Sequence, residues 1–237
     1  MEKIRLDKYL CDLGTAPRSE CRRIIRSGRV RVDGETVSAP ETKIDPRAAR
    51  VTLDGESLVW AEHHYYMMNK PAGVLTATED RRQKTVLDLL PEELRRMGLF
   101  PVGRLDRDTR GLLLLTDDGD FAHRVISPKF AVEKMYDASV EGSLDESDAA
   151  AFAEGLVLGD GTVCRPARLE ILEEGRCLVT VTEGKYHQVK RMLASRGAPV
   201  TALKRLSIGA LRLPEGLPEG AAVALGEEDL CRVFMVR

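Results

Sequence analysis

The chain has 237 residues, of which 43% are hydrophobic and 31% are charged, and its formal net charge is -2. This length and composition predict one or two globular domains with a mainly aliphatic core, because aromatic residues make up only 5% of the chain. The balanced charge gives no indication of nucleic-acid binding from the chain as a whole, so such a function has to rest on local clusters of basic residues.

The cysteines and the apolar segments limit the compartment and the class of protein. Five cysteines occur without any CxxC spacing, which predicts reduced thiols in a cytoplasmic protein and argues against a disulfide framework or a structural metal. The N-terminus is charged and the apolar runs are short, so we expect neither a signal peptide nor a membrane span. The sequence has no glycine-rich phosphate loop and no metal-ligand cluster, so we expect no cofactor. We also expect a monomer.

Residues 1–59 are expected to form a small domain, followed by a larger one over residues 60–237. Helical spacing of apolar residues begins at Ile4, and a second helix is expected between Pro17 and Gly28, where the glycine stops it. Residues 30–34 and 51–55 alternate in polarity and then reach an Asp-Gly pair, which predicts two hairpins.

The larger domain is expected to be an antiparallel-rich α+β fold, because its strands are many and mostly joined by short turns. The expected strands lie at residues 65–68, 74–78, 112–116, 134–141, 163–172, 178–182, 202–213 and 221–224. The expected helices lie at residues 86–97, where Pro91 interrupts the helical stretch, and at residues 120–126, 145–155, 186–196 and 227–231. Asp120 is the predicted cap of the second of these helices, and residues 159–161 are expected to form a hairpin turn.

A basic segment lies in the small domain, where residues 18–31 carry six arginines and one acid, a local charge of +5 (six minus one). Arg18, Arg22 and Arg26 are spaced four apart and share one helix face. Guanidinium groups bind phosphate oxygens bidentately, so this face suits RNA; the alternative is a solvated face paired with acids such as Asp7 and Asp12. The RNA-binding candidates are Arg5, Lys8, Arg18, Arg22, Arg23, Arg26, Arg29 and Arg31.

Residues 5–10, 19–25 and 28–34 together resemble the S4 RNA-binding domain, and the resemblance covers most of residues 3–50. It implies an S4-like fold for the small domain and binding to structured RNA.

Residues 102–119 read VGRLDRDTRGLLLLTDDG, a polar loop with two carboxylates that leads into an apolar strand. Gly103 and Gly111 permit unusual backbone angles on either side of Asp106 and Asp108. A loop held by a rigid strand is a good support for a reactive side chain. Composition alone nevertheless favours a structural turn, in which these carboxylates accept hydrogen bonds from the local backbone.

The same string resembles the active-site segment of the RsuA-type family of ribosomal pseudouridine synthases. Residues 68–74, 127–136 and 183–192 fit that family in the same order, so the resemblance spans nearly the whole chain. It implies that Asp106 is the catalytic nucleophile, that Tyr136 is the active-site tyrosine and that Lys190 is the basic partner of the aspartate. Related synthases often have arginine where this chain has Lys190, so pairing of Asp106 with the adjacent Arg191 is the alternative.

Pseudouridine formation detaches uracil from its ribose, turns the base and rejoins it through carbon 5. The carboxylate of Asp106 can attack the base, attack the sugar or assist loss of a proton from the sugar. Tyr136 offers a ring for stacking on the extruded base. We expect Arg104 to neutralise phosphates or fill the space left by the base, Leu105 to form an apolar wall, and Arg191 to contact the substrate.

The expected substrate is 16S ribosomal RNA in a pre-ribosomal particle, with uridine 516 as the implied target, because residues 127–129 and 187–192 look closer to the small-subunit members of the family. A synthase acting on 23S RNA and a non-catalytic ribosome-assembly protein are the alternatives. An RNA methyltransferase is disfavoured, because the sequence lacks a glycine-rich strand-loop-helix for the methyl donor. His187 is interpreted as a helix-start or core histidine without a catalytic role.

Overall fold

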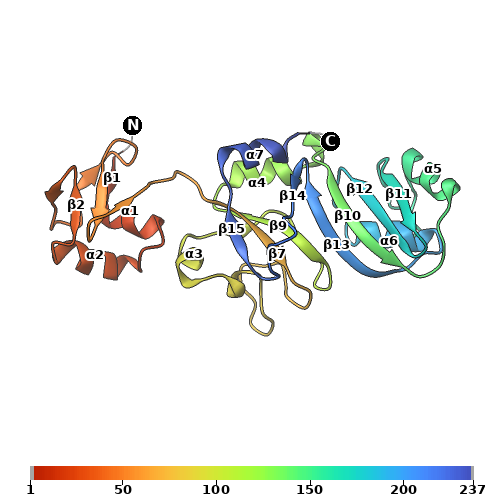
Figure 1. Ribbon diagram of the computed structural model, residues 1–237, viewed down its shortest axis with the longest axis horizontal. Coiled ribbons are helices and arrows are strands. Elements are labelled where there is room, and N and C mark those ends of the chain that lie inside the picture. The colour runs from red at the N-terminus through yellow and green to blue at the C-terminus, as the bar shows by residue number, and fades with distance from the viewer. Residues whose placement is uncertain (1–2, 236–237) are drawn as a thin grey trace. The chain divides into compact units, whose positions relative to one another are not determined.

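The computed structural model describes residues 3–235, which form two compact units (Figure 1). The first unit is the chain up to His64 together with Leu90–Leu99, and the second is Tyr65–Leu89 together with the chain from Phe100 onward. The boundary expected at residue 59 assigns residues 90–99 to the larger domain, whereas the structure packs them with the first unit. Within residues 3–235, no helix combines the length and the apolar character that crossing a bilayer requires.

The first unit packs short helices on short antiparallel strands. Its elements are β1 (Ile4–Arg5), α1 (Leu6–Asp12), α2 (Arg18–Arg26), β2 (Val30–Val32), β3 (Glu35–Thr36), β4 (Lys43–Ile44), β5 (Val51–Leu53), β6 (Glu56–Leu58) and α3 (Glu92–Arg96). The strands form a sheet of order β3-β2-β5-β6 and a separate β1-β4 pair. Both Asp-Gly pairs have positive φ angles at both residues, as a type I′ hairpin turn requires, which confirms the two predicted hairpins.

The core of the first unit is aliphatic, with one buried aromatic residue, Tyr9. Leu6 and Leu10 of α1 pack with Ile24 and Ile25 of α2 against the inner faces of β2 and β5. Trp60, the single tryptophan of the chain, packs against this core.

The second unit is built on one large sheet of order β11-β12-β10-β13-β9-β7-β15. Its strands are β7 (Tyr65–Lys70), β8 (Phe100–Pro101), β9 (Arg110–Thr116), β10 (Lys134–Val140), β11 (Arg168–Glu173), β12 (Arg176–Val181), β13 (Val200–Ile208), β14 (Leu211–Arg212) and β15 (Ala222–Ala224). Its helices are α4 (Gly119–Ile126), α5 (Glu146–Glu154), α6 (Gln188–Ser195) and α7 (Glu227–Val233), with short 3₁₀ turns at Leu87–Leu89 and Pro128–Phe130. A mixed, mostly antiparallel sheet in an α+β fold is what the sequence predicted.

The two halves of this sheet have separate hydrophobic cores. Helices α4 and α7 cover the half made by β7 and β9, and α5 and α6 cover the half made by β10, β11 and β12 (Figure 1). The halves join where β9 and β13 pair in parallel, with Gly111 opposite Arg205. A Cβ atom on Gly111 would lie 2.2 Å from the Arg205 carbonyl oxygen, so only glycine allows the strands to approach this closely.

Three local predictions need correction. The strand expected over residues 74–78 reduces to an isolated bridge between Leu75 and Thr85. Asp118, not Asp120, caps α4, because its side chain accepts a hydrogen bond from the Phe121 amide. The strand expected over residues 163–172 begins only at Arg168; Val163 makes an isolated bridge to Val157 around the predicted hairpin turn.

Candidate active site

A buried lysine, Lys70, holds the backbone of the loop that precedes β9. Lys70, at the end of β7, is fully buried, and its ammonium group donates to the carbonyl oxygens of Pro71 (2.9 Å), Asp106 (3.2 Å), Arg107 (3.3 Å) and Thr109 (2.9 Å). Burial lowers the pKa of Lys70 to about 8, although the nearby carboxylates act in the opposite direction. The loop is thereby fixed by backbone contacts, which leaves its side chains free to point elsewhere.

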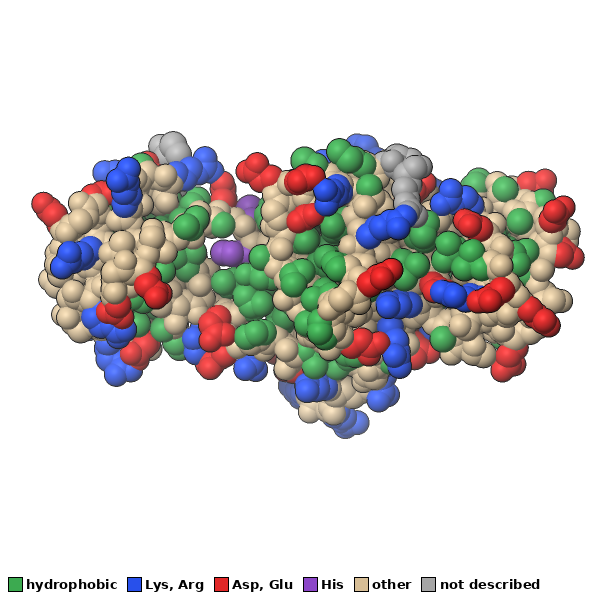
Figure 2. Space-filling model, viewed as in Figure 1, with side chains coloured by type: hydrophobic (Ala, Val, Ile, Leu, Met, Phe, Trp, Pro, Cys, Tyr) green, Lys and Arg blue, Asp and Glu red, His purple; other side chains and the backbone are tan. Residues whose placement is uncertain are grey.

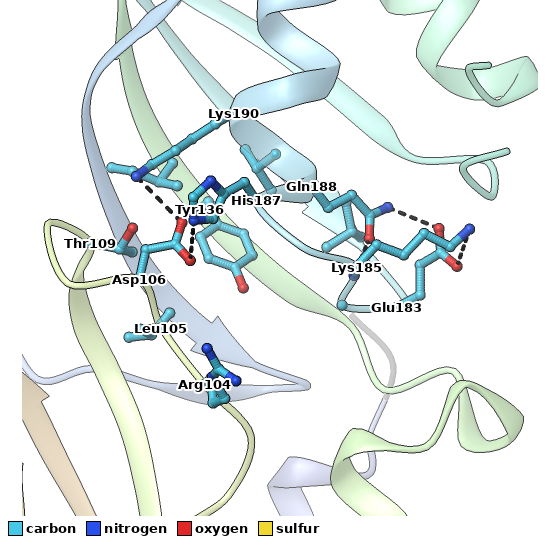
Figure 3. Close-up of a pocket in the computed structure, with 14 residues that line it drawn as sticks. Arg104, Leu105, Asp106, Thr109, Tyr136, Glu183, Lys185, His187, Gln188 and Lys190 are labelled. Atoms are coloured by element: carbon cyan, nitrogen blue, oxygen red, sulfur yellow. Dashed lines mark hydrogen bonds and ion pairs between the residues drawn. The ribbon is translucent and has the colours of Figure 1, made fainter. Parts of the chain in front are cut away.

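Two basic groups converge on the carboxylate of Asp106 (Figure 3). The Nζ atom of Lys190 lies 3.3 Å from Oδ2, and the Nε2 atom of His187 lies 3.5 Å from Oδ1. Lys190 also donates to Asp108 at 2.5 Å, and this hydrogen bond lowers the pKa of Asp108. The Asp106 side chain is 28% exposed, so it remains accessible from the adjoining cleft.

Helix α6 and the turn before it supply these basic groups. His187 is the N-cap residue of α6 with a left-handed backbone (φ 48), so the predicted helix-start position is confirmed, but its ring contacts Asp106. The turn is braced by the buried Glu183, which accepts from the Arg165 amide and the Gln188 side chain, both at 2.9 Å. Burial would raise the pKa of Glu183, but these hydrogen bonds and Lys185 lower it overall.

Lys190, rather than Arg191, is the residue that faces Asp106. Arg191 turns away: its Nη2 lies 2.5 Å from Asp160 Oδ1, and its Nη1 donates to the Tyr186 carbonyl oxygen at 3.3 Å. The alternative left open by the sequence is therefore decided by geometry. Arg191 lines neither of the two cavities next to Asp106.

Tyr136 stands on β10 directly opposite Arg205 on β13, and the pair forms the sheet side of the site. Arg205 is only 3% exposed; its Nε donates to the Leu112 carbonyl oxygen at 2.8 Å and its Nη1 to the Tyr136 hydroxyl oxygen at 3.3 Å. Lys134, two residues before Tyr136, is also buried, and burial together with the charge of Arg205 lowers the pKa of Lys134 to about 8. Two buried cations thus flank the tyrosine.

The side chains enclose a small pocket of about 80 Å³ around Asp106, Thr109 and Tyr136, beside a wider cleft of about 640 Å³. Leu105 is buried and lines the small pocket, as expected for an apolar wall. Arg104 is exposed, lines both spaces and lies apart from the group around Asp106 (Figure 3). Together these groups place a carboxylate, an aromatic ring and hydrogen-bond donors around one pocket.

Asp106, Tyr136 and Lys190, which the sequence placed in one site, line one pocket in the structure. The sequence assigns no role to the neighbouring Lys70, Lys134 and Arg205. Lys70 lies within residues 68–74, one of the segments that resemble the family, but the motif implied no role for it. A signal for Arg205 exists in the alternation of β13, since Leu203, Arg205 and Ser207 are all buried on one face.

Most of the basic residues of the first unit are paired with acids. Arg5, Arg18 and Arg22 all contact the fully buried carboxylate of Asp7 at 3.0, 3.4 and 2.9 Å. The other pairs are Lys8 with Asp12, Arg23 with Glu20, Arg29 with Asp54, Arg47 with Glu62, and Arg96 with Glu92. Among the residues that the structure describes, Arg26 and Arg31 make no ion pair. The face shown in Figure 2 likewise has acidic and basic side chains interspersed.

Comparison with known proteins matches both units. Residues 64–195 match the family model described as RNA pseudouridylate synthase, and residues 4–56 match the model of the S4 domain. The uncharacterized RNA pseudouridine synthase YtzG of Bacillus subtilis is 43% identical over 96% of this chain and 97% of its own length. Ribosomal small subunit pseudouridine synthase A of Salmonella typhimurium is 40% identical over 97% of this chain and 100% of its own. A crystal structure of a pseudouridylate synthase has 37% identity and a TM-score of 0.68, covering 97% of this chain and 99% of that one.

Proposed function

We propose that this chain, which belongs to the RNA pseudouridylate synthase family, converts uridine 516 of 16S ribosomal RNA into pseudouridine. An S4 domain lies ahead of its synthase domain. The family resemblance drawn from the sequence motifs is confirmed, and the protein is an isomerase. The choice of the small-subunit RNA is supported by relatives of about 40% identity named for the small subunit, which align with nearly the whole chain.

The observation that carries the proposed chemistry is the carboxylate of Asp106, accessible in a pocket with Lys190 at 3.3 Å. Isomerisation breaks the bond from uracil N1 to the ribose and forms a bond from C5 to the same carbon, while one proton leaves C5 and one is gained at N1. No atom is added to the nucleotide, so a nucleophile and proton-transfer groups suffice. We assign Asp106 the role of the nucleophile.

The other residues of the site have supporting roles in this proposal. Lys190 balances the negative charge of Asp106 while the carboxylate is attached to or released from the nucleotide. Tyr136 stacks on the extruded uracil, and Leu105 closes the pocket on its apolar side. Arg104 and the unpaired Arg26 and Arg31 contact RNA phosphates, and those arginines that share Asp7 keep further N–H groups available for the same purpose. The enzyme acts as a cytoplasmic monomer on a pre-ribosomal particle.

The proposal is tested by mapping pseudouridines in both ribosomal RNAs of cells that lack this protein. We expect one mark to be absent, at uridine 516 of 16S RNA, and we expect a plasmid copy of the wild-type gene to restore it. A plasmid carrying Asp106→Asn at the same protein level should not restore the mark. Loss of a mark from 23S RNA alone would contradict the substrate assignment, and restoration by Asp106→Asn would contradict the role of the carboxylate.

A further inference from the structure

Tyr186 is a large aromatic residue whose side chain is left uncovered beside the active site. It lies in the turn between β12 and α6, is 72% exposed, and lines the same cleft as Asp106, Tyr136 and Arg104. An aromatic ring this exposed buries little apolar surface, so packing does not account for its presence. Its position at a cleft that receives RNA gives it a different use.

The ring of Tyr186 is held in a fixed orientation. It stacks on the ring of His187 with a centroid distance of 3.8 Å and an angle of 19° between the planes. The backbone on both sides is anchored, since Arg191 donates to the Tyr186 carbonyl oxygen and His187 has the left-handed conformation of an N-cap. His187 therefore covers one face of the tyrosine ring. Because the Tyr186 side chain is largely exposed, the opposite face is open to a stacking partner.

The stack leads directly to the reactive carboxylate. His187 contacts Asp106 at 3.5 Å through Nε2 and Tyr186 through its ring face. A base placed on the outer face of Tyr186 adds one further layer of about 3.4 Å, the spacing of stacked bases. Such a base lies about two layers from His187. The nucleotide next to the one held at Asp106 can reach this position.

Extrusion of the target uridine creates the need for this surface. When a nucleotide leaves its stack, the neighbouring base loses a stacking partner on one side. An exposed aromatic ring replaces that partner for any base, because every base has a π-face. Exposed Arg104, on the same cleft, supplies a positive charge for the accompanying phosphate.

We propose that the Tyr186–His187 stack is a platform for the base adjacent to the target uridine in the RNA substrate. This inference rests on the proposed function, since it presupposes that a uridine is held at Asp106. Tyr186 acts in binding and leaves the chemical step to Asp106 and Lys190.

The test compares steady-state kinetics of Tyr186 variants on 16S ribosomal RNA isolated from cells that lack the protein. Tyr186→Ala and Tyr186→Leu should raise KM about five- to a hundredfold, the range expected for one lost base-aromatic stack, with little change in kcat. Tyr186→Phe keeps the ring and should restore KM to within about twofold of wild type. Val157→Ala, which shortens another exposed side chain (68% exposed), is the matched control.

A fluorescence measurement locates the base. A short single-stranded RNA carries uridine at its centre and 2-aminopurine at either the 5′ or the 3′ neighbouring position. Binding of the wild-type protein should quench one of the two labels more than Tyr186→Leu does. Equal quenching by both proteins at both positions would overturn the platform.

Three kinetic outcomes also overturn it: a KM for Tyr186→Ala within twofold of wild type, a Tyr186→Phe defect as large as that of Tyr186→Ala, or a lower kcat at unchanged KM. The last result would mean that Tyr186 only orients His187. If the wild-type protein forms no pseudouridine in 16S RNA, the proposed function fails instead, and the fluorescence measurement still decides the platform.

Discussion

Asp7 and Asp106 are both carboxylates beside cations, one in each unit, but their surroundings differ. Asp7 is fully buried, and guanidinium groups of Arg5, Arg18 and Arg22 occupy its oxygens. Asp106 is 28% exposed, and its basic contacts of 3.3 and 3.5 Å are longer than a usual charge-assisted hydrogen bond. A carboxylate with every acceptor position filled holds a fold together, whereas one with loose contacts beside a cleft keeps lone pairs for a substrate.

Substitution of Asp106 should have the most severe consequence for activity. Asp106→Asn preserves the shape of the side chain but removes the nucleophile, so kcat for pseudouridine formation should fall about 10³-fold or more. Stability should change little, because the carboxylate makes no short hydrogen bond in the fold. Single-turnover assays and thermal unfolding measure the two effects. A variant with wild-type kcat would place the reactive group elsewhere.

Lys190 should give the next largest effect. Lys190→Met removes the ammonium group that lies 3.3 Å from the Asp106 carboxylate. Loss of one electrostatic contact to a reacting group is expected to lower kcat about 10²- to 10³-fold. Lys190→Arg keeps the charge and should recover part of the rate. If methionine and arginine behaved alike, charge compensation at Asp106 would be the wrong explanation.

Asp7 should show the opposite profile, with a stability defect in the first unit and a nearly normal kcat. Asp7→Asn leaves three arginines without their anion, and we expect a loss of about 3 kcal/mol, the lower part of the range for a broken buried pair because the arginines are 40–49% exposed. Trp60 is the single tryptophan and packs on this core, so its fluorescence reports the first unit during urea unfolding. A transition unchanged from wild type would contradict the structural role of Asp7.

The same carboxylate makes the first unit sensitive to acid. Hydrogen bonds from Arg5, and then from Arg22 and Arg18, hold the pKa of Asp7 well below its usual range, against the effect of burial. A carboxyl whose pKa is depressed by folding contributes fully above its unfolded pKa of about 3.8, and its contribution falls as the pH drops below that value. The Trp60 transition should therefore shift to lower urea between pH 5 and pH 3, and Asp7→Asn should reduce that shift.

Sequence patterns predicted the parts of this structure that depend on local rules. The Asp-Gly hairpins, the apolar strand after the Asp106 loop and the helix that begins near His187 follow from turn chemistry and periodicity. The expected cap of α4 lies two residues beyond the observed one because the aspartates at 117, 118 and 120 all satisfy the same rule.

The sequence could not show which charges would meet. Six arginines within residues 18–31 predict a positive strip. Arg18 and Arg22 nevertheless both contact Asp7 on α1, one of the acids that the sequence offered as the alternative partner. Lys70 binds carbonyl oxygens of the loop before β9, and Arg205 binds the Leu112 carbonyl oxygen on β9. A basic residue that faces backbone carbonyls far away in the sequence has no periodic pattern of its own. Family motifs supplied Asp106, Tyr136 and Lys190 because their spacing reflects the fold, which elementary periodicity does not encode.

Substitution of Asp108 should affect the rate least. It shares the Lys190 ammonium with Asp106, at 2.5 Å, but its side chain is 75% exposed. An exposed pair of this kind is worth about 0.2–1 kcal/mol, so Asp108→Asn should lower kcat by no more than about fivefold, through looser positioning of Lys190. A loss as large as that of Asp106→Asn would mean that the two carboxylates act as one catalytic unit. An increase in kcat would instead show that Asp108 draws Lys190 away from Asp106, so this single substitution separates a residue that orients the cation from one that competes for it.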